Sequence, residues 1–171
     1  MNRPIPVDEL DDRLPAKARL IGIDLGTKTI GLAVSDVERR LASPLTTLRR
    51  TTFQKDADAL LAIFAEFEIA AIVLGLPLDL EGRDGPRAQS TRAFARNLAT
   101  RTDLPLAYWD ERFSTAAVLR SLIENDVSRA RRAEVVDRMA AAYILQGALD
   151  RLSPKSGRRT SAKEIINFLR T

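Results

Sequence analysis

The 171-residue chain contains no cysteine and no histidine. The absence of cysteine excludes disulfide bonds and thiolate metal sites. The absence of histidine excludes Ser-His-Asp triads, imidazole general bases and zinc sites with histidine ligands. Any bound metal ion must therefore be held by oxygen atoms, which favours Mg²⁺ or Mn²⁺.

Long hydrophobic runs are also lacking, and no stretch is long enough to cross a membrane. The first 15 residues are polar and acidic and contain three prolines, so we expect no signal peptide and a cytoplasmic protein. The hydrophobic content of 45% and charged content of 29% are ordinary for a globular domain. The length favours one domain with a sizeable core. A net charge of +4 is compatible with nucleic-acid binding but does not require it.

Residues 20–31 combine a buried apolar run, an acidic residue and a tight turn. They begin as an apolar run, typical of a strand buried on both faces, and Asp24 interrupts this run near its end. An ionised carboxylate in such a strand is costly unless it is paired, hydrogen-bonded or bound to a metal. A tight turn over residues 26–28 leads into a second strand over residues 29–35. Aspartate at a strand end is common in hairpins, so this stretch alone leaves a functional and a purely structural role equally open.

The rest of the chain alternates between strand and helix patterns. We expect strands over residues 41–48, 69–74 and 105–109, and helices over residues 54–68, 86–100, after residue 114 and over 133–150. Pro44 cannot donate a ladder hydrogen bond, so the third strand belongs at a sheet edge. Short turns make the first three strands antiparallel neighbours, whereas helical crossovers make the later strands parallel to the first. The pattern predicts an α/β fold with a mixed five-stranded sheet, in the order 3-2-1-4-5, and helices on both faces.

Three segments divide the chain, and the predicted domain spans residues 19–152. Residues 1–18 are expected to be a flexible N-terminal extension because they combine prolines with an acidic patch. Residues 153–171 begin as a linker and are rich in lysine and arginine, which predicts a basic C-terminal tail ending in a short docking helix. Residues 125–132 are expected to form a polar, arginine-rich loop.

Acidic residues gather where such sheets bind ligands, beyond the carboxyl ends of the parallel strands. Asp24 ends the first strand, and Asp110 and Glu111 end the fifth. Asp137 shares a helix face with small alanines, which would let that helix approach the sheet closely. The alternative is that Asp137 pairs with a neighbouring arginine on a solvated face. Converging carboxylates repel one another unless divalent cations neutralise them, so this group predicts a magnesium or manganese site.

Basic residues flank these acids along the sequence. Each alone is more often a solvated charge, but together they are expected where a phosphate backbone crosses an acidic metal site. The candidates for nucleic-acid binding are Lys28, Arg83, Arg87, Arg112, Arg129, Arg131 and Arg132.

Six short motifs, in this order, resemble the YqgF family, which is also called RuvX. They are GIDLGTKTIGLA (residues 22–33), ASPL (42–45), GLPL (75–78), GPRAQ (85–89), DERFST (110–115) and VDRMAA (136–141). The resemblance implies an RNase H-like fold related to Holliday-junction resolvases. It implies that Asp24, Glu111 and Asp137 are the catalytic, metal-binding acids, with Asp110 as a further candidate ligand. It also implies nuclease action at the 5′ end of pre-16S rRNA, in ribosome biogenesis.

Three functions follow as hypotheses. The first is a nuclease that uses Mg²⁺ or Mn²⁺ to hydrolyse phosphodiester bonds in structured RNA, with ribosome precursor particles as partners, or in branched DNA such as a Holliday junction. The second is an ATPase, because residues 24–27 also resemble the phosphate loop of actin-like and sugar-kinase ATPases; the chain lacks the second such motif and second domain. The third is a non-catalytic RNA-binding factor in ribosome assembly. The sequence leaves open whether the protein is a monomer or a homodimer.

Overall fold

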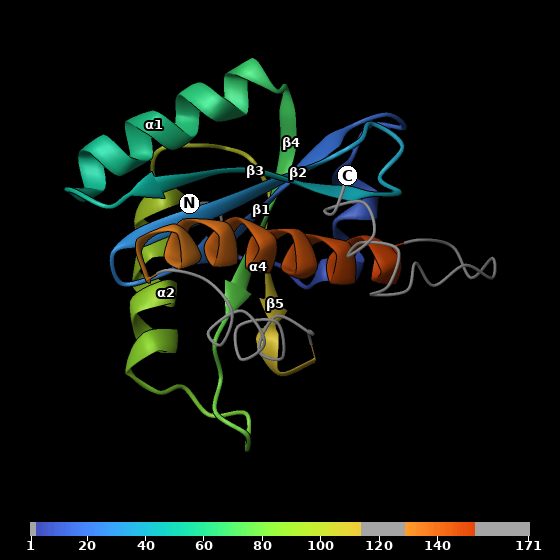
Figure 1. Cartoon of the computed structure of the whole chain (residues 1–171). Helices are drawn as coiled ribbons and strands as arrows, with labels where there is room; N and C mark the ends of the chain where they lie inside the picture. Colours follow the sequence, from blue (N-terminus) through green and yellow to red (C-terminus); the bar gives the residue numbers. More distant parts are fainter. Residues whose placement is uncertain (1–2, 114–128, 153–171) are drawn as a thin grey trace.

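The computed structural model describes residues 3–113 and 129–152, with the side chains of residues 113 and 129–134 left aside. Five strands form one sheet in the order β3-β2-β1-β4-β5, which confirms the predicted order (Figure 1). β2 pairs antiparallel with β1 and with β3, whereas β4 pairs parallel with β1 and with β5. The strands are β1 (Arg19–Leu25), β2 (Thr29–Ser35), β3 (Ala42–Arg49), β4 (Ile69–Leu76) and β5 (Leu106–Asp110).

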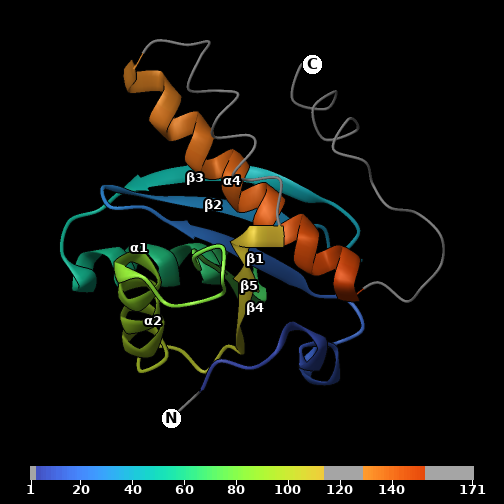
Figure 2. The same cartoon turned by 90° about the horizontal axis from the view of Figure 1, so that it is seen from below.

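Helices cover both faces of the sheet, as predicted. α1 and α2 lie on one face and α4 crosses the other, as the view along the layers shows (Figure 2). The α-helices are α1 (Phe53–Glu66), α2 (Pro86–Leu98) and α4 (Arg129–Leu152), and the short 3-10 helices are η1 (Val7–Glu9), η2 (Asp11–Arg13) and η3 (Glu111–Phe113). None of the helices in the described ranges combines the length and the apolar character needed to span a membrane.

Local sequence explains where these elements begin. The hydroxyl of Thr52 accepts a hydrogen bond from the Lys55 amide at 3.4 Å and so caps α1. Pro86 takes the first position of α2, where a helix needs no amide donor. Pro44 lies in the edge strand β3, opposite Ala33, where the pairing register shifts. Proline therefore occurs where a ladder hydrogen bond is not required.

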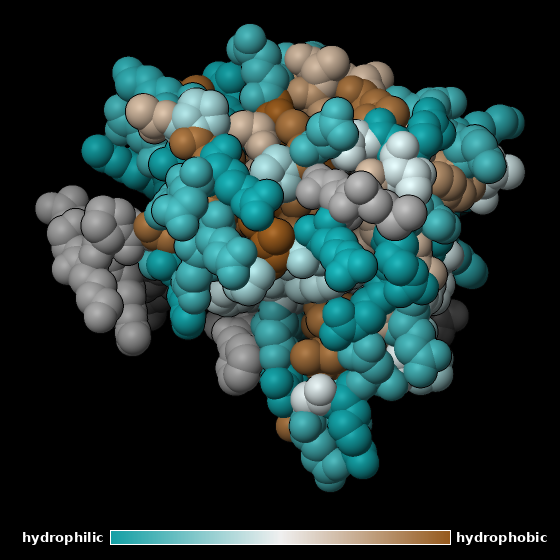
Figure 3. Space-filling model, turned by 180° about the vertical axis from the view of Figure 1, so that it is seen from behind, coloured by the Kyte–Doolittle hydropathy of each residue, from teal (hydrophilic) through white to brown (hydrophobic). Residues whose placement is uncertain are grey.

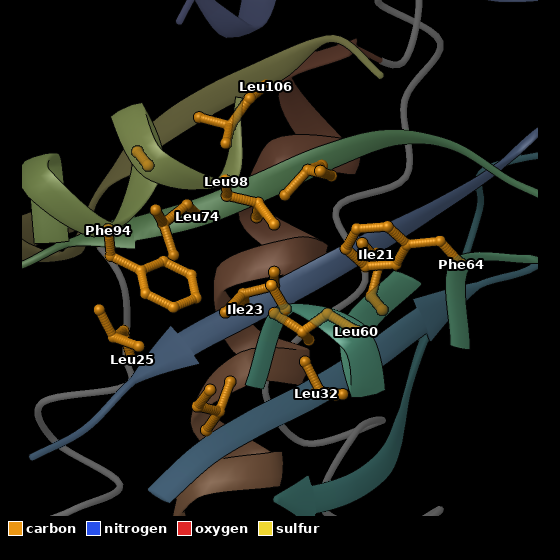
Figure 4. Close-up of a cluster of buried hydrophobic side chains, with 14 of the residues drawn as sticks. Ile21, Ile23, Leu25, Leu32, Leu60, Phe64, Leu74, Phe94, Leu98 and Leu106 are labelled. Atoms are coloured by element: carbon orange, nitrogen blue, oxygen red, sulfur yellow. The ribbon is translucent and has the colours of Figure 1, made fainter. Parts of the chain in front are cut away.

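The two faces of β1 have different characters because side chains alternate along a strand. Ile21, Ile23 and Leu25 point into a cluster of large apolar side chains supplied by α1, α2 and the neighbouring strands (Figure 4). Leu20 and Gly22 face α4, where alanine dominates the contact. Burial of one large apolar side chain contributes about 1.5–3 kcal/mol, so the cluster under α1 and α2 is a major source of stability.

The outer surface over α1 and α2 is mainly hydrophilic, with hydrophobic residues in small separate patches (Figure 3). Among the described residues, Leu80 is the large hydrophobic side chain that stands out in solvent, at 95% exposure. The described residues of this face therefore form no broad apolar surface.

The N-terminal segment differs from the expected flexible extension. Residues 3–18 pack against the β5 edge of the sheet, where the Ile5 amide donates to the Leu106 carbonyl at 2.9 Å. Leu10 is completely buried, in the cluster that α4 covers. The guanidinium of Arg151 donates to both carboxylate oxygens of Asp8, at 2.8 and 2.9 Å. The sequence prediction missed this because Ile5 and Leu10 are isolated apolar residues whose partners come from distant parts of the chain.

The start of α4 is a second correction. Residues 129–132 were expected in a loop, but α4 begins at Arg129. The helix predicted after residue 114 and the tail over residues 153–171 lie outside the described residues.

We expect Leu10→Ala to lower the free energy of unfolding by about 2–5 kcal/mol, because it removes a fully buried side chain and leaves a cavity. Leu80→Ala makes the same chemical change at an exposed position, so its free energy of unfolding should stay within about 0.5 kcal/mol of the parent's. Urea unfolding of both variants provides the measurement. Equal midpoints for the two variants would show that residues 3–18 do not belong to the folded core.

Candidate active site

Asp24 lies at the carboxyl end of β1 and is 1% exposed. Its side chain shares the α4 face of the sheet with Gly22, two residues earlier. A Cβ added to Gly22 would lie 2.7 Å from the Ala141 carbonyl oxygen, so the backbone of α4 lies directly on β1. Asp24 is therefore buried by the helix that crosses above it.

Asp137 is brought next to Asp24 through a second glycine. Gly31 on β2 is the strand partner of Asp24, and a Cβ there would lie 2.0 Å from the Asp137 carbonyl oxygen. The Thr29 hydroxyl, on the same face of β2, donates a hydrogen bond to Oδ2 of Asp137. The helix backbone thus fits over Gly31, and Thr29 orients the carboxylate.

Glu111 reaches the same region from η3 and is 9% exposed. Gly75 on β4 follows Leu74, the strand partner of Ile23, so it is level with Asp24 in the parallel pair. A Cβ on Gly75 would lie 2.6 Å from Oε1 of Glu111. The Glu111 carboxylate therefore occupies the space that a side chain at residue 75 would fill. The three acids lie over three adjacent strands, with Asp24 in the centre.

An open pocket of about 460 Å³ lies at this edge of the sheet. We call it the acidic pocket because two carboxylates line it. Its lining also contains two cations and the turn between β1 and β2. The residues are Asp24, Gly26, Thr27, Lys28, Thr29, Arg87 and Asp137.

Comparison with known proteins identifies the family. Residues 18–151 match the model of a family described as "RuvX: Holliday junction resolvase". The chain belongs to the RuvX family. This confirms the resemblance drawn from the motifs.

Relatives of this RuvX-family chain are similar over most of their length. A protein of Beijerinckia indica is 62% identical over 149 residues, covering 87% of this chain and 90% of the relative. A protein of Nitrobacter winogradskyi is 59% identical over 157 residues, covering 92% of this chain and 95% of the relative. Both bear the name "Putative pre-16S rRNA nuclease". Among solved structures, Thermus thermophilus RuvC in complex with a Holliday junction substrate has a TM-score of 0.50 at 14% identity, covering 79% of this chain and 96% of RuvC. That likeness confirms the RNase H-like fold.

The predicted basic residues have different surroundings in the structure. Lys28 and Arg87 line the acidic pocket, and neither forms an ion pair with an acid in the described ranges. Arg83 instead pairs with Asp79 and Glu81, within the loop between β4 and α2. Arg129, Arg131 and Arg132 belong to the first turn of α4, and their side chains lie outside the description.

Asp110 and Arg112 form an ion pair with several hydrogen bonds. Nε of Arg112 lies 3.0 Å from both carboxylate oxygens of Asp110, and Nη2 lies 2.6 Å from Oδ2. Burial acts to raise the pKa of Asp110, but hydrogen bonds from the side chain and the amide of Arg112 outweigh it and lower that pKa. Arg112 thus occupies the carboxylate of Asp110, and the predicted role of Asp110 as a further metal ligand stays a prediction.

Arg112 also connects two loops. Its Nη1 donates to the Leu80 carbonyl at 3.4 Å, and its guanidinium lies against Gly82, whose φ of +80° suits glycine. The pair with Asp110 therefore holds η3, and with it Glu111, against the loop after β4. We infer that Asp110 and Arg112 position the site.

The oxygen donors fit a hard divalent cation. Among residues 3–113 and 129–152, no three acidic side chains stand close enough together to enclose one metal ion. Magnesium in phosphoryl-transfer sites is commonly held by one or two carboxylates together with substrate phosphate oxygens, however. Asp24 and Asp137 in one pocket match that requirement, with Glu111 over the adjacent strand.

Sequence reasoning missed several residues that shape this site. Gly31 and Gly75 matter because the acids occupy the space above them. Strand alternation in the sequence could have predicted that both glycines lie on the same face of the sheet as Asp24. Arg50 also lies near the turn, where its Nη1 donates to the Gly26 carbonyl at 2.7 Å. No sequence pattern marks this contact, because it joins the end of β3 to a turn 24 residues earlier.

We expect Gly31→Ala to be destabilising by at least about 1–3 kcal/mol, because the new methyl group would overlap the α4 backbone at Asp137. Gly85→Ala is the matched control, since a Cβ there meets nothing within 4 Å. The fluorescence of the single tryptophan, Trp109, reports on this packing because its ring lies against Gly147 of α4. An unfolding midpoint for Gly31→Ala equal to that of the control would contradict the close approach of α4.

The Asp110–Arg112 pair predicts a pH dependence. A lowered pKa means that the folded state favours the ionised carboxylate, so this stability is complete above the ordinary pKa of 3.8 and is lost as the pH falls through the lowered value. Asp110→Asn should therefore be less stable than the parent at pH 7, and the difference should shrink below pH 3.8. Urea unfolding across this range tests it, with Asp103→Asn as an exposed control. A difference that stays constant down to the lowest pH would refute the assignment.

Proposed function

We propose that this chain is a divalent-metal-dependent nuclease that processes the 5′ end of pre-16S rRNA. The observation that carries the proposal is the placement of Asp24, Asp137 and Glu111 over three adjacent strands, beside a pocket that also contains two cations. Membership of the RuvX family and the names of relatives at about 60% identity support hydrolysis of phosphodiester bonds.

Asp24 and Asp137 would hold Mg²⁺ or Mn²⁺ through their carboxylate oxygens, with Glu111 contributing from the adjacent strand. A bound divalent ion lowers the pKa of its water and stabilises the negative charge that develops in phosphodiester hydrolysis. Thr29 donates to Asp137 and so fixes the direction of one ligand. Lys28 and Arg87 would bind non-bridging phosphate oxygens at the mouth of the same pocket.

Branched DNA is the second candidate substrate. The family description names a Holliday junction resolvase, and RuvC with the same fold binds such a junction. The two substrates require the same phosphodiester chemistry. Cleavage of a pre-16S rRNA 5′ segment and of a four-way DNA junction under one set of conditions would separate them.

We expect Asp24→Asn and Asp137→Asn to reduce cleavage by about 100-fold or more, because even the outer partners of metal ligands contribute 10–100-fold. Asp103→Asn is the control, since it removes an exposed carboxylate away from the pocket. Chelation should abolish cleavage, and Mg²⁺ or Mn²⁺ should restore it. Calorimetric titration with Mn²⁺ should show weaker binding for both site variants, independently of turnover.

Wild-type cleavage by a folded Asp24→Asn variant would overturn the assignment of the acids. Binding of RNA that depends on salt and is unaffected by chelation, without cleavage, would instead favour a non-catalytic RNA-binding factor.

A further inference from the structure

A second pocket, of about 240 Å³, adjoins the acidic pocket on the other side of the turn between β1 and β2. The two pockets share Gly26, Thr27 and Arg87. We call the second one the basic pocket because two arginines and no acidic residue line it. Its remaining polar lining consists of the hydroxyl residues Ser90 and Thr91 of α2.

Both arginines of the basic pocket retain their full charge for a ligand. Arg50 and Arg87 form no ion pair with any acid in the described ranges, whereas Arg83, Arg92 and Arg112 all do. The Gly26 carbonyl accepts one hydrogen bond from Nη1 of Arg50 at 2.7 Å. This contact fixes the guanidinium beside the turn and leaves its other N–H groups as donors.

The start of α2 adds to the positive potential. Pro86 is the first residue of this 13-residue helix and lines the basic pocket. Gly85, at the N-cap, provides no side-chain hydrogen bond to the first amides. Amides of a first helical turn that lack an internal acceptor favour a bound anion, and the helix dipole acts in the same direction. The arginines and the helix start therefore favour the same kind of ligand.

We propose that the basic pocket binds a backbone phosphate of the nucleic-acid substrate, next to the phosphate held at the acidic pocket. The assignment of the anion to a substrate backbone rests on the proposed nuclease function. Arg87 lines both pockets and would contact the strand between the two phosphates. The turn over residues 26–28 would lie beneath that strand and set its path.

Ser90→Glu tests this directly, because it places a carboxylate in the basic pocket. Gln89→Glu is the matched control: it makes the same charge change at the next residue, which is also exposed but does not line the pocket. Binding is measured with the full chain and excess chelator, so that cleavage does not interfere. The probes are a labelled structured RNA and a labelled four-way DNA junction.

We expect Ser90→Glu to weaken binding about tenfold or more relative to Gln89→Glu, as for loss of a hydrogen-bonded phosphate contact. The slope of log K against log salt should fall by about 0.9 on duplex DNA, or about 0.7 on a single strand, for each lost contact. Ser90→Lys should strengthen binding and steepen the slope relative to Gln89→Lys. A gain of affinity at the parent's unfolding midpoint would not result from loss of the fold.

Equal affinities and salt slopes for the two glutamate variants would overturn the proposal. A second result would also overturn it: Ser90→Glu abolishes the binding of inorganic phosphate but leaves nucleic-acid binding unchanged. The pocket would then be a site for free phosphate. These measurements do not depend on turnover. Undiminished cleavage by Asp24→Asn would therefore count against the acidic site, and leave the result on the basic pocket intact.

Discussion

The close approach of α4 to the sheet is the constraint on which the site depends. The helix backbone lies on Gly22 and Gly31, where any side chain would overlap it. Because the axis runs so near the strands, Asp137 comes level with Asp24 instead of pointing over a layer of large side chains. The Glu111 carboxylate uses the corresponding space at Gly75. Small residues thus position the charged ones.

Side chains alternate along β1, so the residues that stabilise the fold and the residues of the candidate site lie on opposite faces of the sheet. Ile21, Ile23 and Leu25 make the apolar contacts that stabilise the domain, and they face α1 and α2. Gly22 and Asp24 face α4 and form the floor of the site. A buried carboxylate costs free energy, and that cost is borne by the large apolar cluster on the opposite face. The acid can therefore be buried without a polar residue entering the main core.

The fold could be predicted from sequence because its signals are local. Turn length fixes the antiparallel pairs, helical crossovers fix the parallel ones, and Pro44 identifies an edge. Asp24 and Glu111 follow from the rule for strand ends, and Asp137 follows from its alanine neighbours. These residues were predicted together, and the structure places them over adjacent strands; their roles in binding metal stay a proposal.

Other features could not be predicted, because they depend on contacts between distant segments. The burial of Leu10 requires α4 and the β5 edge to be in place. In the sequence, Arg83 and Arg112 are candidates for phosphate binding just as Arg87 is. In the structure, nearby acids pair with Arg83 and Arg112 but not with Arg87. Charge in a sequence gives no indication of which cations pair internally.

The internal pairing of individual cations shapes the electrostatic field around the site more than the net charge does. The net charge of +4 is modest, and Arg83, Arg92 and Arg112 pair with acids close to the site. Lys28, Arg50 and Arg87 form no ion pair with an acid in the described ranges, and all of them border the turn over residues 26–28. Cations gathered around one turn favour the binding of phosphate there. The turn next to Asp24 therefore separates a region that suits cations from one that suits anions, and a phosphodiester backbone with a metal ion is a ligand that satisfies both.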